Sequence, residues 1–383
     1  MLGRNQRKIP VLSFFSGAGF MDIGFLETGR FSIPWHNECH DPFADAYEHG
    51  VSKAGFNTGS EKIQSRSRLE YIKTGSIFQQ AFDGVRPRVF GVIGGPPCPD
   101  FSRAGKNEGG KGKNGKLTRR FAKVIRELRP SFFVIENVPG LLETKKHRKF
   151  LFSVLQNLGK FYALDLRVLN ALEYGVPQSR RRVFVVGICL KWLERRRRRD
   201  FLAISRKSRE ILQIDVSENR NSKEVAGDIA AQHWFCWPKP QFRDAVARYA
   251  PGAGEKCPPE LSVKHWFSKT KNHPNASDVF RAHSRKFKRV REGDISRKSF
   301  KRLDRRFYSP NAAYGNNEVH LHPTENRRIS VAEALALQAV PKAYCFPEGM
   351  SLTDKFKAVG NGVPVPLARR IALSLAKFLN GEN

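Results

Sequence analysis

The stretch VLSFFSGAGFMDIGF, residues 11–25, joins a short apolar run to a glycine turn and then to a helical pattern. The run is β-branched and aromatic, which is typical of a buried strand. Gly17 and Gly19 let the backbone turn tightly and approach a ligand closely. Because Asp22 follows them, the full glycine fingerprint of dinucleotide-binding folds is absent. The stretch alone fits either a nucleotide-type site or a tight turn.

The alternation of strand and helix continues over the first 190 residues. Buried strands are expected at 90–93, 132–135 and 183–188, and helices at 22–28, 42–47, 119–128 and 147–158. Such alternation favours an α/β layer with a mostly parallel sheet. After Leu190 the pattern breaks into short stretches with isolated aromatic residues. We therefore predict one domain at 1–190, a smaller irregular domain at 191–326, and a return to the first domain at 327–383.

Positive charge dominates the composition. The chain has 68 Lys and Arg against 36 Asp and Glu, a formal net charge of +32. Between residues 191 and 306, thirty basic residues stand against fourteen acidic ones, so half of the excess lies in under a third of the chain. Such self-repulsion opposes compaction and indicates a polyanionic partner, with nucleic acid as the first choice. RRRRR at 195–199 is expected to be a backbone clamp or solvated charge.

Cysteine usage and hydropathy indicate the compartment. The six cysteines form no CxxC pair, which favours free thiols in a reducing cytoplasm. His36, Cys39 and His40 lie close in sequence but lack a second ligand pair, so we predict no metal site. Since no long uncharged apolar run exists, we expect neither a membrane span nor a secretory signal.

Polar residues stand at the ends of several expected strands. GGPPCPDF (94–101) places Cys98 after a stiff Pro-Pro turn, among neighbours unlike those of a buried structural cysteine, which makes it a candidate nucleophile. FFVIENVPGL (132–141) delivers Glu136 to a strand end, where dry surroundings would raise its pKa and let it donate a proton. A helix cap or a loop acid is the alternative for Glu136. Glu38 ends a second strand, where an acid can bind ribose hydroxyls.

Two basic stretches flank these positions. YGVPQSRRRVFVVGI (174–188) places Gln178, Arg180 and Arg182 before a strand, and paired guanidiniums there suit phosphate or base oxygens. Ordinary solvated arginines are the alternative. The glycine- and lysine-rich tract 103–117 is expected to be a mobile loop that its lysines draw onto a nucleic-acid backbone, or else a disordered basic surface loop.

Taken in order, these stretches resemble the motifs of the DNA cytosine-5 methyltransferases, above all the bacterial enzymes of restriction–modification systems. The matching stretches are FSGAGF, NE at 37–38, GPPCPDFS, ENVPGL, QSRRR, RRISVAEALALQAVP and VGNGVPVPLARRIA. They lie within 11–189 and 326–376, about three fifths of the chain.

The resemblance implies a fold and a reaction. Residues 1–190 would be a Rossmann-like, AdoMet-dependent methyltransferase domain, and 191–326 a target recognition domain. Residues 327–383 would add the recognition-domain helix and complete the cofactor pocket. The cofactor would be S-adenosyl-L-methionine, with S-adenosyl-L-homocysteine as product, and the substrate double-stranded DNA. We expect a monomer at the bacterial nucleoid, with a restriction endonuclease as a functional partner and not a physical one.

The resemblance also implies roles for single residues. Cys98, Glu136 and Arg182 would be catalytic, with Arg180 supporting the same pocket. The cofactor would contact Phe15, Gly17, Gly19, Glu38, Cys39, Ser76, Ile77, Pro96, Asn361 and Val363. DNA would contact Ser102, Lys106, Lys111 and Gln178. Two positions depart from the family pattern, since Ser76 stands where many members have Asp and Cys39 where an aromatic residue is common. The adenine contacts are therefore not predicted.

Three alternatives stay open at this point. A tRNA cytosine-5 methyltransferase shares the scaffold but carries a late Cys-Phe-Thr motif, which this chain lacks. A non-catalytic DNA-binding relative would have no need for Cys98, Glu136 and Arg182 together. A nicotinamide-dependent oxidoreductase is disfavoured by the incomplete glycine fingerprint.

Overall fold

The computed structural model describes residues 8–56, 63–97, 113–217, 220–251, 255–281, 288–297, 299–311, 314 and 319–382. Within these, a seven-stranded sheet has the order β3-β2-β1-β4-β5-β7-β6. The strands are β1 (Ile9–Phe14), β2 (Phe31–Asn37), β3 (Ile63–Ser65), β4 (Gly91–Gly94), β5 (Phe132–Asn137), β6 (Tyr162–Asn170) and β7 (Arg181–Cys189). β7 runs antiparallel to β5 and β6, and the other neighbours pair in parallel. The expected α/β class with a mostly parallel sheet is confirmed.

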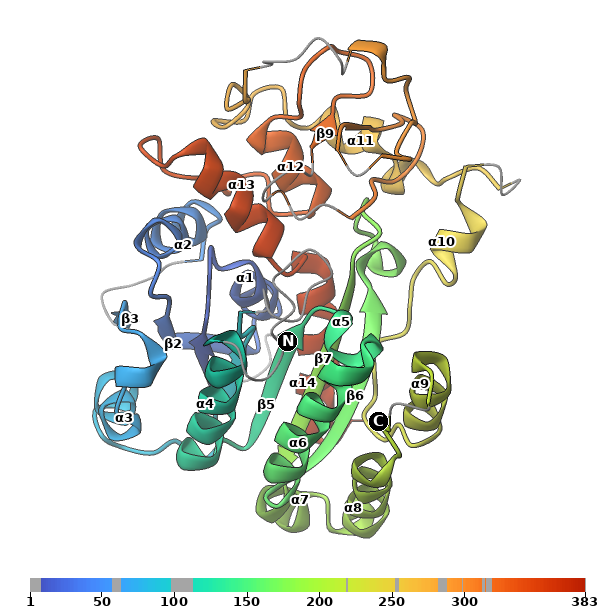
Figure 1. Cartoon of the computed structure of the whole chain (residues 1–383). Coiled ribbons are helices and arrows are strands. Elements are labelled where there is room, and N and C mark those ends of the chain that lie inside the picture. The colour runs from blue at the N-terminus through green and yellow to red at the C-terminus, as the bar shows by residue number, and fades with distance from the viewer. Residues whose placement is uncertain are drawn as a thin grey trace, which may run out of the picture.

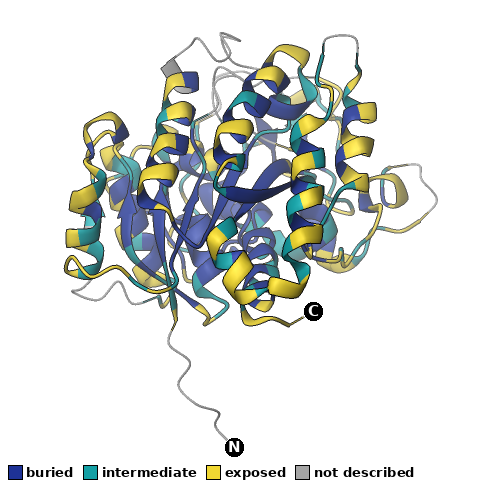
Figure 2. Cartoon of the chain, turned by 90° about the horizontal axis from the view of Figure 1, so that it is seen from below, coloured by how far each residue is buried: buried dark blue, intermediate teal, exposed yellow. Residues whose placement is uncertain are grey.

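Helices cover both faces of the sheet, as the buried strands in Figure 2 show. Alternate residues of a strand point to opposite faces. On β5, Phe133 packs in the cluster that contains α3 (Thr74–Phe82), α4 (Lys113–Leu128) and α6 (Lys145–Gly159). Phe132 faces the other way, toward α14 (Val365–Asn380), which itself packs along α1 (Phe20–Leu26). The remaining elements before α7 are α2 (Asp41–Lys53), η1 (Leu69–Tyr71), α5 (Gly140–Glu143) and η3 (Ala171–Tyr174).

The strand register brings the ends of several strands to one edge of the sheet. Phe14 of β1 pairs with both Asn37 of β2 and Gly94 of β4. Gly94 in turn pairs with Ile135 of β5. β7 enters at the same edge, because it is antiparallel and its Val183 faces Asn137. Residues after four parallel strands and before β7 therefore meet at this carboxyl edge, where open α/β sheets bind ligands.

Two expectations about local structure were wrong. The tract 103–117 was expected to be a loop. Residues 103–112 lie outside the described residues, but α4 begins at Lys113, so residues 113–117 are helical. Leu117 and Phe121 pack on the sheet and extend the apolar stripe of that helix toward its start. β6 was not expected at all. Its sequence YALDLRVLN carries Asp165 in the middle, but this buried carboxylate accepts hydrogen bonds from the amides of Trp234 (2.9 Å) and Phe235 (2.8 Å).

The first part of the segment 191–326, which was expected to form a second domain, packs against the sheet of the first domain. Its opening helices are α7 (Leu190–Arg196), α8 (Arg198–Gln213) and α9 (Ser222–Ala231). Ile211 of α8 and Val225 of α9 belong to the same core cluster as Leu164 of β6. The later elements lie above the carboxyl edge in Figure 1. They are α10 (Ala245–Arg248), η4 (Pro259–Leu261), α11 (Val263–Phe267) and the parallel pair β8 (Lys301–Arg302) and β9 (His320–Leu321).

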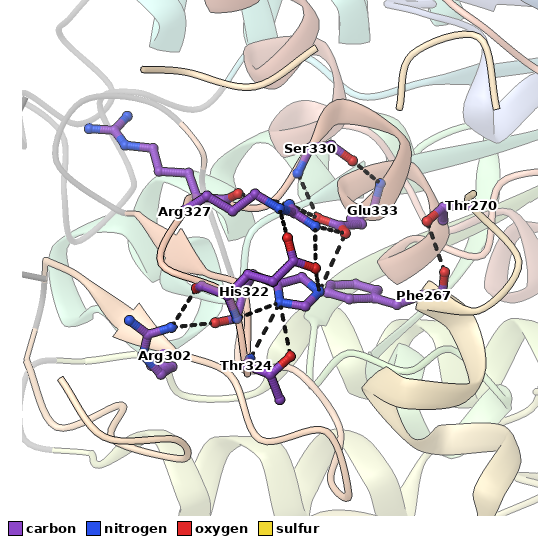
Figure 3. A network of polar contacts seen from close by, with 10 residues as sticks. Phe267, Thr270, Arg302, His322, Thr324, Arg327, Ser330 and Glu333 are labelled. Carbon is purple, nitrogen blue, oxygen red and sulfur yellow. Dashed lines mark hydrogen bonds and ion pairs between the residues drawn. The ribbon is translucent and has the colours of Figure 1, made fainter. Parts of the chain in front are cut away.

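The last 57 residues join the two parts, through α12 (Val331–Leu337), α13 (Leu352–Asn361) and α14. Tyr47 of α2 shares a buried cluster with Leu335 of α12. α12 begins in the capping box expected from its sequence, where the Glu333 carboxylate accepts from the Ser330 amide at 2.7 Å. That carboxylate also binds Arg327 at 2.7 Å (Figure 3). None of the described helices is long and apolar enough to cross a membrane.

Candidate active site

A buried carboxylate and a buried guanidinium meet at the carboxyl edge. Glu136 lies near the end of β5, and its Oε1 accepts from Nε of Arg182 at 2.9 Å. Each residue is only 7% exposed. Burial raises the pKa of Glu136, while the positive charges of Arg182 and Arg180 lower it, and the balance leaves the pKa above its ordinary value. This carboxyl group therefore holds a proton more readily than a surface glutamate does.

The Pro-Pro turn after β4 passes beside this pair. A Cβ placed on Gly95 would lie 2.9 Å from Oε2 of Glu136. Nδ2 of Asn137 donates to the carbonyl of Pro96 at 3.3 Å. The described segment 63–97 thus passes Glu136 at Gly95 and ends two residues later, at Pro97. The expected nucleophile and three expected DNA contacts lie outside the described residues: Cys98, Ser102, Lys106 and Lys111.

Arg180 joins parts of the chain that are far apart in sequence. Its fully buried guanidinium donates to the carbonyls of Gly360 and Gly362, the latter at 2.9 Å. It also donates to Oδ1 of Asn311 at 3.2 Å. Burial lowers the pKa of Arg180 well below its usual value. Arg180 therefore joins the closing Gly-Asn motif and Asn311 to the start of β7, and its role in supporting the pocket stays a prediction.

The glycine turn and Glu38 form a cradle on β1 and β2. The amide of Gly17 donates to Oε2 of Glu38 at 3.0 Å, and the amide of His40 donates to Oε1 at 2.9 Å. Gly17 has a φ of 54°, and no described atom lies within 4 Å of the place its Cβ would take. Gly19 has a φ of 88°, but its Cβ would lie 2.6 Å from Val51. Gly17 thus borders open space, whereas Gly19 is packed against α2.

A family model for C-5 cytosine-specific DNA methylases matches residues 9–377. The chain belongs to this family. It is similar to the type II methyltransferase M.NmeDI of Neisseria meningitidis serogroup C, with 40% identity over 99% of this chain and 86% of the relative. It is also similar to the type II methyltransferase M.MthTI of Methanothermobacter thermautotrophicus, with 28% identity over 97% and 98% of the two chains.

Solved structures agree on the fold of this DNA cytosine-5 methyltransferase. The Dnmt2 methyltransferase of S. pombe superposes with a TM-score of 0.57 and 14% identity, over 97% of this chain and 99% of that one. The methyltransferase EhMeth of Entamoeba histolytica gives 0.58 and 12%, over 98% and 99%. At such low identity the likeness concerns the fold alone.

The family uses S-adenosylmethionine as methyl donor, and the cradle of this methyltransferase fits that group. The space beside Gly17 admits a ligand close to the backbone, and Glu38 offers a carboxylate of the kind that accepts from ribose hydroxyls. Burial raises the pKa of Glu38 although backbone amides donate to it. No cluster of three or more His, Cys, Asp or Glu side chains that could bind a metal occurs in the part of the chain described here.

The other residues expected to contact the cofactor differ in how far they are buried. Phe15 turns at a positive φ of 52° and packs edge-on against the Phe121 ring, 5.5 Å away between centroids. Ile77 is fully buried in the core. The exposed positions are Cys39, Ser76 and Asn361, and the buried ones are Pro96 and Val363. Cys39 and Ser76, where the sequence departs from the family pattern, are thus both at the surface.

Gln178, expected to contact DNA, is fully buried. Its Oε1 accepts from Nε2 of Gln338 at 3.4 Å, and its backbone bridges to Ser309. In this conformation Gln178 joins the chain before β7 to Ser309 and to the end of α12. A contact between Gln178 and DNA stays a prediction that requires this packing to open.

Two buried polar residues of the site lie in stretches that were quoted from the sequence, but no structural role was predicted for either. Asp22 accepts hydrogen bonds from Ser13 (2.8 Å) and Tyr47 (2.9 Å), which anchors α1 below the glycine turn. Nδ2 of Asn37 donates to the carbonyls of Ser65 and Ser67, both at 2.9 Å, and so fixes the chain after β3. A charged residue inside the apolar stretch 20–26 was the available signal for Asp22.

Proposed function

We propose that this methyltransferase modifies one specific cytosine in double-stranded DNA, as the modification enzyme of a type II restriction–modification system, through covalent attack by Cys98. The buried Glu136–Arg182 pair beside the Pro-Pro turn carries the proposal. The Neisseria and Methanothermobacter relatives, both named as type II methyltransferases, support the biological setting. The net charge of +32 supports a polyanionic substrate.

The target base must first leave the stacked duplex, because none of these side chains can reach C6 inside it. The Cys98 thiolate then adds to C6, forming an S–C6 bond and pushing electron density toward C5 and N3. Glu136 hydrogen-bonds N3 and the 4-amino group, and its raised pKa favours the protonated form that donates to N3. Arg182 contacts O2 and, already desolvated by burial, stabilises the charge that develops there.

S-adenosylmethionine supplies an electrophilic methyl group when bound. That methyl would pass to C5, which addition at C6 makes enamine-like, as the methyl–sulfur bond breaks and S-adenosyl-L-homocysteine is left. C5 then loses its proton to a base, and the S–C6 bond breaks to regenerate the Cys98 thiolate. Gly17 and Glu38 would bind the ribose side of the cofactor. The product after methyl transfer would be S-adenosyl-L-homocysteine.

The recognition domain is proposed to lie within 191–326, in the part from α10 onward that sits above the carboxyl edge (Figure 1). Its lysines and arginines would contact phosphates, while a few side chains read bases. We further propose a monomer in the bacterial cytoplasm that acts on the same DNA site as a cognate endonuclease without binding it.

Transfer of labelled methyl from S-adenosylmethionine to duplex DNA and to tRNA tests the substrate. We expect label in duplex DNA, and label in tRNA alone would overturn the proposal. Bisulfite sequencing of DNA from expressing cells would then locate the modified cytosine.

A Cys98→Ser variant tests the nucleophile. It should bind DNA but form no trapped complex with 5-fluorocytosine DNA. Glu136→Gln is the matched control, since it keeps Cys98 and should still form the adduct, only more slowly. Adduct formation by Cys98→Ser would refute the assignment.

A further inference from the structure

The edge of the sheet opposite the candidate active site carries a band of exposed basic residues. It is formed by the loops that precede β4, β5 and β6, and by α7 with the start of α8, which lie at the foot of the sheet in Figure 1. We call residues 83–90, 129–131, 160–161 and 190–199 the basal strip. Its loop part presents the exposed side chains of Arg86, Arg88, Arg129 and Lys160. Its exposed acidic residues are Asp83 and Glu194.

Aromatic rings order the arginines in the loop part of the basal strip. The guanidinium carbon of Arg86 lies 5.1 Å from the centroid of Phe90, and that of Arg129 lies 5.1 Å from the centroid of Phe161. Arg86 also donates to the carbonyl of Arg129. Arginine that stacks on a ring keeps N–H groups at its edge, and these can bind a phosphate in a fixed geometry.

The basal strip runs without interruption into α7. The amide of Leu190 donates to the carbonyl of Phe161 at 3.0 Å, so α7 begins beside the ring that Arg129 covers. α7 spans seven residues, or about 10 Å. Four exposed arginines lie where α7 ends and α8 begins: Arg195, Arg196, Arg198 and Arg199. None of these four forms an ion pair with a residue that the structure describes.

RRRRR, expected to be a backbone clamp or solvated charge, thus lies away from the segment proposed for recognition. The recognition segments lie above the carboxyl edge, whereas α7 and α8 follow β7 to the opposite edge (Figure 1). A strand of six residues is about 20 Å long. A straight duplex at the carboxyl edge therefore cannot reach the basal strip as well.

We propose that the basal strip binds the phosphate backbone of a second duplex segment while the first lies at the active site. Duplex DNA is the occupant that the charge favours, because it presents one negative charge per about 1.7 Å of axis and needs no sequence match. A second contact of this kind holds a neighbouring segment close to the enzyme. It would speed transfer between distant sites on one molecule, since sequence-independent contacts support hopping along DNA.

The test uses the full-length enzyme and a short random duplex of about 16 base pairs, too short to wrap from one edge to the other. The variant is R195Q/R196Q/R198Q/R199Q, and its matched control is R195K/R196K/R198K/R199K, which keeps the charge at the same exposed positions. Native mass spectrometry at low salt should find two duplexes per wild-type and lysine-variant molecule, and one per glutamine variant.

The salt dependence of the second binding event gives a second readout. Each phosphate contact contributes roughly 0.9 to the slope of log affinity against log salt. The glutamine variant should therefore lose about 2 to 4 from that slope, and the lysine variant less than 1. A separate variant on the loops, R88Q/K160Q, should lose about 1 to 2, which tests the strip without altering α7 or α8.

Binding of one duplex by the wild type, or of two duplexes by all glutamine variants, would overturn the proposal. Methylation of a short duplex that contains the target should stay within about twofold of wild type in every variant, because none of the altered residues touches the site. If methylation fails in the wild type while the second duplex still binds, the proposed function fails and the basal strip stands.

Discussion

Gly17 and Gly19 stand two residues apart in one turn, both at positive φ, yet alanine should have different effects at the two positions. At Gly19 the new Cβ would lie 2.6 Å from Cγ2 of Val51 and 3.0 Å from the Tyr47 ring. Left-handed backbone in a non-glycine residue costs about 1–3 kcal/mol, and overpacking costs about 1–3 kcal/mol more. We therefore expect Gly19→Ala to lower the free energy of unfolding by about 2–6 kcal/mol.

At Gly17 no described atom lies within 4 Å of the new Cβ. Only the backbone strain remains, partly offset by the lower entropy of the unfolded chain, so the expected loss of stability is about 1 kcal/mol. If the cofactor lies beside Gly17, the methyl group instead collides with it. An overpacking cost of about 1–3 kcal/mol corresponds to roughly 5- to 150-fold weaker binding.

Urea denaturation monitored by circular dichroism measures the first effect, and calorimetric titration with S-adenosylmethionine measures the second. Cofactor should raise the melting temperature of the wild type, and raise that of Gly17→Ala much less at the same concentration. Unchanged cofactor affinity in Gly17→Ala would refute the placement of the cofactor in this cradle. Wild-type stability of Gly19→Ala would refute the packing of the turn against α2.

Three further substitutions test the rest of the site. Arg182→Ala removes a charge that lowers the pKa of Glu136, so this pKa should rise further. Because the protonated carboxyl is the proposed donor, the high-pH arm of the rate profile should move to higher pH. An arm that does not move would contradict the assigned pair. Arg180→Ala should lower the free energy of unfolding, measured by urea denaturation, by about 3–5 kcal/mol, because it leaves buried carbonyls without their donor. A loss below about 1 kcal/mol would argue against this structural role. Ser330→Ala should cost about 1 kcal/mol by opening the capping box with Glu333, whereas Ser330→Asp should retain most of the stability.

The strand-end residues could be predicted because local sequence determines them. Short apolar runs that end in polar residues located Glu136 and Glu38, and the parallel register of β1, β2, β4 and β5 brings such positions to one edge. The alternation of Arg180 and Arg182 toward the interior, with Arg181 outward, follows from the period of a strand. These predictions needed only periodicity and the rule that parallel strands share an edge.

Other features depended on partners that the local sequence does not reveal. β6 was missed because Asp165 interrupts its apolar pattern. That carboxylate is acceptable in a core because the amides of Trp234 and Phe235, about seventy positions later, donate to it, and the His233 ring pairs with it at 2.7 Å. The contact of Arg180 with Asn311 has the same character, since no motif marks Asn311. Buried polar residues whose partners are distant in sequence are thus the ones that sequence reasoning overlooks.

The closing segment shows why the site needs both ends of the chain. A Cβ on Gly362 would lie 2.2 Å from the Phe20 ring, so α1 and the turn before α14 approach as closely as glycine allows. The same turn offers its carbonyl to Arg180 at 2.9 Å. Phe20 begins the helix of the cofactor cradle, and Arg180 lies two residues before Arg182, the partner of Glu136. A shift of the turn at Gly362 is therefore expected to disturb the cradle and the acid–guanidinium pair together, which makes this late segment a structural part of the candidate active site.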